Sequence, residues 1–136
     1  MNRAVTWLSI VVALVIGGKY GLEYMFRSGE EHAAHERVRE MLDGMKPGGD
    51  LQRSICLWYR GSRSLDQYEF NQGADAFDAW RAKKGVNLIK DYVIDEAVLV
   101  EGGERLATGV VLVTGSMDGK RFAIRAIPRE PLQWED

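Results

Sequence analysis

The sequence has few of the residues on which most site chemistry depends. Cys56 is the only cysteine among 136 residues. A single cysteine excludes an internal disulfide and any zinc site built from several thiolates. Cys56 lies in the segment SICLWY, between bulky apolar residues, and this setting predicts a buried, inert thiol. Arg53 and Arg60 lie close to it in sequence, so a reactive thiol is the alternative.

An excess of one charge is also missing. The chain has 18 lysines and arginines against 20 aspartates and glutamates, a formal net charge of −2, and the two signs are interspersed. Such a chain lacks the basic field that draws a protein onto nucleic acid. Internal repeats and low-complexity stretches are absent from the sequence as well, which favours one folded domain without a nucleic-acid partner.

The sequence gives only a weak indication of a metal site. The only histidines, His32 and His35, are three residues apart with Glu31 and Glu36 beside them, and ligands at this helical spacing can share a metal ion. Zinc proteases need the order H-E-x-x-H, which EHAAHE does not supply. A solvated helix face with an ion pair between Glu31 and His35 explains the same residues, so we predict no metal site.

Catalytic patterns are equally sparse. Acid–base catalysis needs paired carboxylates, but with 20 acidic residues some pairs arise by chance. The glycines near residues 102 and 115 lack the lysine and serine of a phosphate-binding loop. We therefore predict no enzyme activity, no catalytic residue, no cofactor and no small-molecule ligand. The carboxylates weighed for such a role are Asp75, Asp78, Asp91, Asp95 and Glu96.

What the sequence does contain is a long apolar run at its N-terminus. Residues 4–18 carry no charge and follow Arg3, and the apolar character resumes after Lys19. Residues 4–26 would form about 33 Å of helix, which matches a hydrocarbon core of about 30 Å. We predict a transmembrane anchor over residues 1–27, with a signal peptide cleaved after Gly17 as the alternative. The residues expected at the membrane interfaces are Trp7, Lys19, Tyr20 and Tyr24.

One face of the predicted span is made of small residues. Ser9, Ala13, Gly17 and Gly21 follow one another at intervals of four, so they share a helical face. Small side chains allow close approach of helices in lipid. This face predicts packing against another membrane protein or a second copy of the chain; a plain anchor is the alternative.

The topology follows from the short basic region before the span, which favours export of the rest of the chain to the periplasm. Arg27, Arg37 and Arg39 follow the span and argue for the opposite orientation. The charge rule works best for loops below about 60 residues, and the segment after the span is longer. We therefore expect a single-pass membrane protein with its domain on the exported side.

Three helices are expected after the span. Residues 28–47 form an amphipathic juxtamembrane helix, because Ser28 and Glu31 match a capping box and Pro47 lies where a helix ends. Residues 51–60 form a helix between Asp50 and Gly61, with a buried strand as the alternative. Residues 74–85 form a third helix that brings Phe77 and Trp80 to the core.

The C-terminal part changes to strand periodicity. Strands are expected within residues 90–103, 105–115 and 120–128, and Asp118 with Gly119 suits a type I′ hairpin turn. The middle strand is apolar on both sides, which predicts cover on both faces of the sheet. Residues 48–136 thus form a small α+β domain ending in an antiparallel meander.

The order of helices and meander resembles the cystatin-like or nuclear-transport-factor-2-like roll, a likeness of architecture that brings no activity with it. A spanning helix extended before a sheet also resembles type IV pilins, although the glycine-phenylalanine processing site of pilins is absent.

Candidate docking residues lie near the C-terminus. An extended strand would point three arginines to one side: Arg121, Arg125 and Arg129. They would form a basic strip for a partner, or else only the solvent-exposed side of an edge strand. Trp134 would fold back as an apolar plug or remain free for docking.

These features favour a non-enzymatic accessory or assembly subunit. The anchor would pack on partner helices, and the soluble α+β domain would serve as a docking module. One alternative is a ligand-binding or enzymatic pocket domain, which would need convergent polar groups among Phe77, Trp80, Val111 and Phe122 that the sequence does not show. The other is a pilin-like filament subunit.

Overall fold

The computed structural model describes residues 27–102 and 109–135 of the chain. Within these residues three helices precede a four-stranded antiparallel sheet, which confirms the predicted α+β class. The elements are a first helix over residues 27–44, here called the long helix, then α2 (Leu51–Arg60), α3 (Gln67–Lys83), β1 (Tyr92–Glu101), β2 (Val110–Met117), β3 (Lys120–Ala126) and β4 (Gln133–Trp134).

The predicted transmembrane anchor lies outside the described residues. Among the helices that are described, none is long and apolar enough to span a bilayer. The packing face from Ser9 to Gly21 and the expected interface residues belong to residues 1–26, so both stay predictions.

The long helix buries one stripe of side chains. Val38, Met41 and Leu42 of this helix are 0% exposed, as their helical spacing predicts, and so is Met45 in the turn that follows. The helix does not begin at a Ser28 cap, because residues 27 and 28 are already helical. Glu31, the other half of the expected capping box, instead accepts a hydrogen bond from the main-chain N of Leu99, at 2.8 Å. Glu31 thus ties the helix to β1.

The second helix matches its sequence signals. Asp50 caps α2 by accepting from the main-chain N of Arg53, at 3.2 Å, and Gly61 ends it with a φ of 70°. A left-handed residue at this position favours glycine because no Cβ clashes. The strand alternative for this segment is therefore wrong.

The third helix is longer than expected. It begins at Gln67 and not at Ala74, because Asp66 accepts a hydrogen bond from the main-chain N of Glu69 at 2.8 Å. The first half of α3 is polar and contains Gly73, so its sequence lacks an apolar stripe. Gly73 lies against the ring of Tyr59, where a Cβ would come within 3.0 Å of the ring carbon Cγ.

The sheet has the predicted meander topology with one added strand. Its order is β1-β2-β3-β4, and all neighbours are antiparallel. Asp118 and Gly119 have φ values of 48° and 82°, the positive values that a type I′ turn requires. The short strand β4 follows a turn after β3 and was not predicted.

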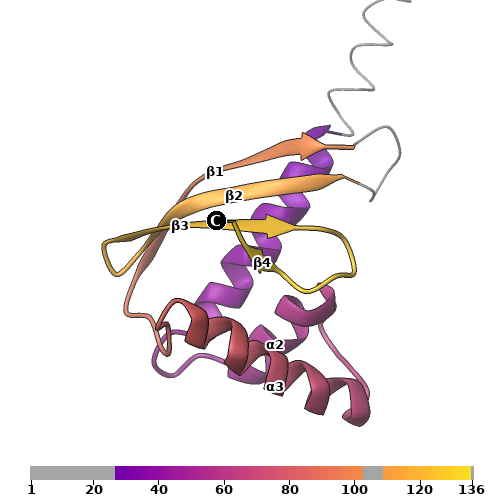
Figure 1. Cartoon of the computed structure of the whole chain (residues 1–136), viewed down its shortest axis with the longest axis vertical. Coiled ribbons are helices and arrows are strands. Elements are labelled where there is room, and N and C mark those ends of the chain that lie inside the picture. The colour runs from indigo at the N-terminus through magenta and orange to yellow at the C-terminus, as the bar shows by residue number, and fades with distance from the viewer. Residues whose placement is uncertain (1–26, 103–108, 136) are drawn as a thin grey trace, which may run out of the picture.

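The helices cover one face of the sheet. In Figure 1 the strands pass in front of the long helix, while α2 and α3 lie toward the β4 side. Val111, Val113 and Ile124 pack in one cluster with the buried stripe of the long helix and with Phe77 of α3. The expectation of cover on both faces is wrong for the described part of the chain, where no element lies over the other face.

Candidate functional site

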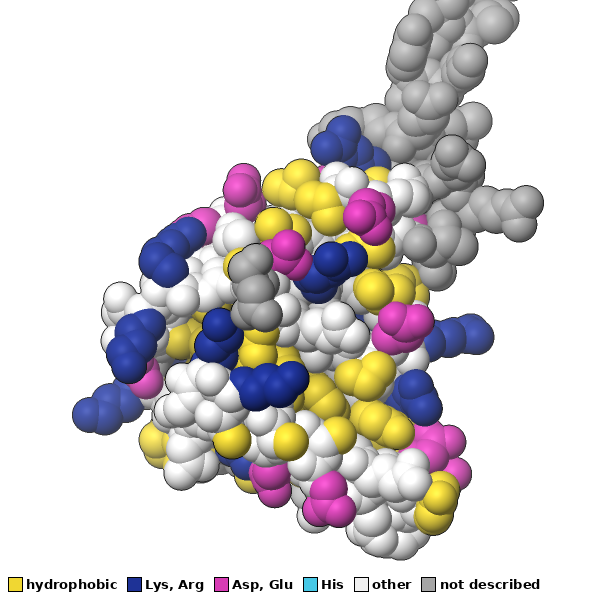
Figure 2. Space-filling view, in the orientation of Figure 1, with side chains coloured by type: hydrophobic (Ala, Val, Ile, Leu, Met, Phe, Trp, Pro, Cys, Tyr) yellow, Lys and Arg dark blue, Asp and Glu magenta, His cyan; other side chains and the backbone are white. Residues whose placement is uncertain are grey.

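The uncovered face of the sheet carries apolar side chains. It is called the outer face here, and its apolar residues are Val93, Val98, Leu112 and Ala123. Each lies on a strand between two residues that pack on the core, so strand alternation turns it away from the helices. Val93 is 55% exposed, and the other three are half-buried. Figure 2, in the same orientation as Figure 1, shows hydrophobic side chains between charged ones on this side.

Ion pairs flank the apolar residues of the outer face. Arg121 pairs with Asp95 across the sheet, and Arg125 lies 3.8 Å from Glu101 and 3.5 Å from Glu135. Val98, Leu112 and Arg125 form one row across three strands. The same face carries Thr114, opposite Ala123, and Ser116, opposite Val93. Apolar, hydroxyl and mutually paired charged side chains thus alternate on the outer face, a mixture that protein interfaces share.

The predicted strip of three arginines is not one surface. β3 ends at Ala126, and Arg129 lies in the following turn with a φ of 64°. Pro128, which has no N–H for pairing, precedes it. Arg121 and Arg125 therefore belong to the outer face, whereas Arg129 lies elsewhere, on a cavity described below.

The edge of β1 is poorly suited to accept another strand. Its register shifts twice, between Ile94 and Glu96 and between Leu99 and Glu101, and the Leu99 N–H is bound by Glu31. Bulges and acidic side chains are common protections of an edge strand. A partner is thus better accommodated on the outer face than along this edge.

Trp134 folds back onto the domain. Its ring stacks on Trp80 with centroids 4.0 Å apart and planes 3° from parallel. Its indole Nε1 donates to the main-chain oxygen of Trp80 at 2.8 Å. These contacts match the plug alternative, while a docking role for Trp134 stays a prediction.

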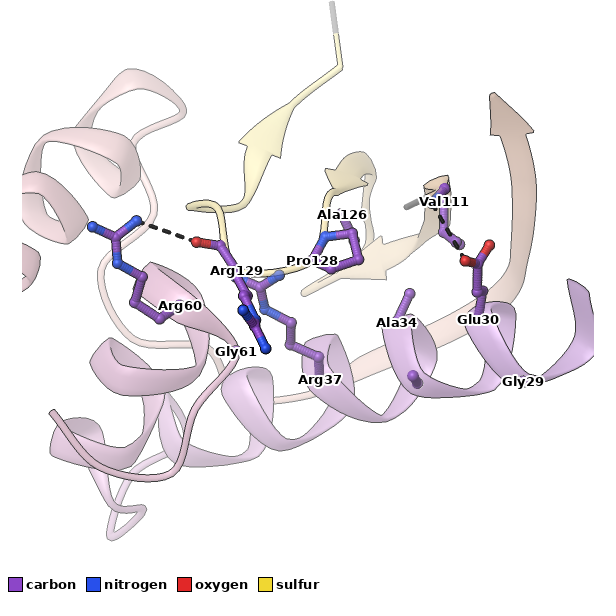
Figure 3. A pocket seen from close by; sticks show the side chains of 12 residues that line it. Gly29, Glu30, Ala34, Arg37, Arg60, Gly61, Val111, Ala126, Pro128 and Arg129 are labelled. Carbon is purple, nitrogen blue, oxygen red and sulfur yellow. Dashed lines mark hydrogen bonds between the residues drawn. The ribbon is translucent and has the colours of Figure 1, made fainter. Parts of the chain in front are cut away.

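A cavity of about 300 Å³ opens beside the first turns of the long helix. Ala33 and Ala34 form its helix side, and Val111 of β2 with Ala126 of β3 form its sheet side. Figure 3 shows Arg37, Arg60 and Arg129 toward one end and Glu30 toward the other. Glu30 is buried, and its Oε1 accepts from the main-chain N of Gly109 at 3.4 Å.

Arg37 binds main-chain carbonyl groups at the cationic end. Four of its five N–H groups donate to carbonyl oxygens: Nε to Leu57 at 2.6 Å, Nη1 to Ile127 at 3.1 Å, and Nη2 to Trp58 at 2.9 Å and Glu130 at 2.5 Å. Burial lowers the pKa of Arg37 to about 10, so the guanidinium is charged at neutral pH. Its hydrogen bonds join the long helix to the end of α2 and to the turn before β4.

The other two arginines of the cavity are exposed. The Arg60 guanidinium lies 4.5 Å from the centroid of the Tyr59 ring, and its Nη1 donates to the main-chain oxygen of Arg129 at 3.2 Å. Neither Glu30 nor this use of Arg37 was predicted from the sequence. The one available signal was the position of Arg37 beside the apolar stripe, three residues after Ala34 and four before Met41.

The remaining candidate residues lie apart from this cavity. Cys56 is buried, as predicted, and burial raises the pKa of its thiol. His35 lies 3.5 Å from Glu36, while Glu31 binds Arg27 instead of the expected His35. Across residues 27–102 and 109–135 no cluster of three or more potential metal ligands occurs. Of the apolar residues weighed for a pocket, Phe77, Trp80 and Phe122 pack in the core, and Val111 lines the cavity.

Comparison with known proteins adds no family. No protein-family model, no curated protein and no solved structure matches this chain.

Proposed function

We propose that this chain is a non-enzymatic accessory subunit of a membrane complex, anchored by one helix and docking on a partner through the outer face of its sheet. The anchor is the predicted span over residues 1–27, and the domain is held on the exported side. The partner is another protein of the same membrane.

The supporting observation is the one-sided cover of the sheet. The outer face leaves four apolar side chains uncovered, Val93, Val98, Leu112 and Ala123, and the arginines beside them are already paired with carboxylates. A sheet with one face packed on a core usually has a polar second face. Apolar side chains there gain from burial by about 25 cal/mol per Å² when a partner covers them.

The small-residue face of the predicted span supports the same function. Ser9, Ala13, Gly17 and Gly21 provide a second contact within the membrane. Two contacts on one chain bind a partner more tightly than either alone, because the second forms at a high effective concentration.

Crosslinking from the outer face tests the docking surface. A photoreactive amino acid placed at Leu112 in the full chain should give one discrete crosslinked product in native membranes. The same amino acid at Gln72, an exposed residue of α3, should give none. A second substitution, Ala123→Glu, should abolish the Leu112 product while the thermal midpoint stays unchanged.

The outcome also distinguishes the partner. A product of twice the mass of the chain would assign the outer face to a second copy and overturn a hetero-complex. No product at Leu112, or an equal product at Gln72, would reject the outer face as a docking surface.

The span is tested separately. Replacing Gly17 and Gly21 with leucine should weaken co-purification of the crosslinked partner, since larger side chains keep the helix backbones apart. Ala4→Leu, outside the small-residue face, is the matched control. Unchanged association in the glycine variant would leave the span as a plain anchor.

A further inference from the structure

The arginines around the cavity differ in charge pairing from the other arginines. In the described part of the chain, seven arginines lie within ion-pair distance of a carboxylate, whereas Arg37, Arg60 and Arg129 do not. These three line the same cavity. The paired arginines are Arg27, Arg39, Arg53, Arg63, Arg81, Arg121 and Arg125.

Three guanidinium groups at one end of a cavity create a local positive potential. Like charges that lie close together repel, and a bound anion relieves this repulsion. Guanidinium groups also match carboxylate and phosphate geometry with paired hydrogen bonds. Arg37 is held by carbonyl groups, but the side chains of Arg60 and Arg129 are exposed and can reach a ligand.

Apart from glycines and Glu30, which is buried at the opposite end of the cavity, the rest of the lining is apolar. Ala33, Ala34, Val111, Ala126 and Pro128 present hydrocarbon to the space. The volume of about 300 Å³ is at the lower end of the roughly 300–1,000 Å³ typical of ligand pockets. This space accommodates one narrow apolar chain, and it is too small for the two chains of a phospholipid.

The cavity also has a direction. Its apolar part begins at Gly29, close in sequence to the predicted span, and Arg37 lies about 12 Å further along the helix. The cationic end thus lies away from the predicted membrane surface. A fatty acid drawn from the bilayer would place its head at the arginines and leave its chain along the apolar wall, directed back toward the predicted span.

We propose that this cavity binds an amphiphile with one acyl chain and an anionic head, taken from the membrane as a fatty acid. The head group binds Arg60 and Arg129 beside Arg37, and the chain lies against Ala33, Ala34, Val111 and Ala126. Binding in the cavity is independent of the docking function; only the source of the ligand depends on the predicted anchor.

Photolabelling of the full chain tests this site. The chain is reconstituted in vesicles of neutral phosphatidylcholine with dodecanoic acid that carries a diazirine in its chain, at mildly alkaline pH. We expect labelled peptides from both walls of the cavity, one containing Ala33 and Ala34 and the other containing Ala126. Excess unlabelled dodecanoic acid should remove this labelling, and excess dodecanol should not.

Two variants separate charge from shape. Arg60→Gln with Arg129→Gln should lower cavity labelling about ten-fold, since two charged donors to the head group are lost. Arg63→Gln, which alters an exposed arginine outside the cavity, should leave it unchanged. Ala33→Phe should fill the cavity and remove labelling, which tests the site even where the double variant fails to fold. Labelling of the predicted span, residues 4–26, serves as the internal reference for the amount of probe dissolved in the bilayer.

Three results would overturn the proposal. The first is the absence of cavity labelling in the wild-type chain. The second is equal cavity labelling of the wild type by the diazirine acid and by the corresponding diazirine alcohol, or equal labelling of the wild type and the double variant by the acid, since either result removes the anionic head from recognition. The third is competition by inorganic phosphate without competition by dodecanoic acid, which would assign the arginines to a free phosphate.

Discussion

Tyr92 shows how a single polar side chain fixes a strand on a helix. Its hydroxyl donates to Asp43 Oδ1 at 2.6 Å, and this bond joins β1 to the long helix. Burial, together with the hydrogen bond to the Asp43 carboxylate and its negative charge, raises the pKa of Tyr92. The folded chain therefore keeps this phenol protonated at pH values where an unfolded chain would ionise it.

Replacing Tyr92 with phenylalanine should lower the free energy of unfolding by about 1 kcal/mol at neutral pH, the usual contribution of a hydrogen bond. The effect depends on pH. Above about pH 10 the unfolded wild type loses the phenol proton that the folded state retains, so wild-type stability falls. Phenylalanine has no such proton, and the difference between the two proteins should shrink as the pH rises from about 9 to 11. Urea unfolding of both proteins at about pH 9 and about pH 11 measures this difference in unfolding free energy.

Tyr68→Phe is the matched control for this prediction. Tyr68 is 72% exposed on α3, so its loss should leave the unfolding free energy within about 0.5 kcal/mol at either pH. A Tyr92→Phe protein whose deficit is the same at both pH values would contradict the assigned role of the proton.

At the scale of the element, Gly115 sets how closely β1 and β2 approach. A Cβ on Gly115 would lie 2.0 Å from the main-chain oxygen of Val93 and 3.0 Å from Cε1 of Phe122. The register shift between Ile94 and Glu96 lies beside this contact. Glycine is required here by the neighbouring strand and not by its own φ angle.

Gly115→Ala should therefore disturb the β1–β2 pairing near Val93 and lower the unfolding free energy by about 2–3 kcal/mol. Hydrogen exchange of the β1 amides should accelerate in the same variant. Ser116→Ala, on the adjacent outer-face position of β2, should change stability by less than about 0.5 kcal/mol. Wild-type exchange rates in Gly115→Ala would show that the strands can separate enough to accept a methyl group.

The sequence signals predicted those elements whose ends are marked locally. Asp50 and Gly61 bound α2, and Asp118 with Gly119 forms the predicted turn, because caps and turns depend on a few neighbouring residues. The polar half of α3 was missed, since its stability depends on the Asp66 cap and not on an apolar stripe. Strand β4 was missed because two residues are too short for a periodicity, and Trp80 holds them by stacking.

The cavity was beyond prediction for a related reason. Its three arginines come from the long helix, the end of α2 and the turn after β3, so only the folded chain brings them together. The sequence predicted that the middle strand carries apolar side chains on both faces, and Leu112 is such a side chain on the outer face. It also predicted that this face is covered, which is wrong for the described residues. Whether helices cover one or both faces of a sheet depends on the directions in which they run relative to it, and the spacing of apolar residues does not determine those directions.

At the scale of the whole molecule, Arg37 joins parts that no strand pairing connects. Its guanidinium binds carbonyl groups of Leu57, Trp58, Ile127 and Glu130, while its main chain belongs to the long helix. The turn before β4 is further held by the Leu132 N–H, which donates to the oxygen of Trp58 at 3.0 Å. Arg37 therefore links the long helix to both α2 and this turn, while Leu132 adds a second link between α2 and the turn.

Arg37→Met should destabilise the full chain by about 3 kcal/mol, because partly buried carbonyl groups lose their charged donor. Arg37→Lys should recover only part of this loss, since an ammonium group cannot reproduce the planar fork. Tryptophan fluorescence during urea unfolding measures both. Arg63→Met is the control, because that side chain is 78% exposed and lies 3.8 Å from Glu40. Equal stability of the Lys variant and the wild type would contradict a role for the fork.

The orientation of the long helix has a mechanical consequence. The helix passes behind the strands in Figure 1, and its buried side chains Val38, Met41 and Leu42 belong to the same core cluster as the inner side chains of β2 and β3. With residues 1–27 held in a bilayer, tension reaches the domain along the helix axis and loads these contacts in shear. Contacts loaded in shear resist together, whereas contacts peeled from one end break in turn. In the proposed complex, a pull between the anchor and a protein on the outer face would therefore be resisted by these contacts together and not by one of them at a time.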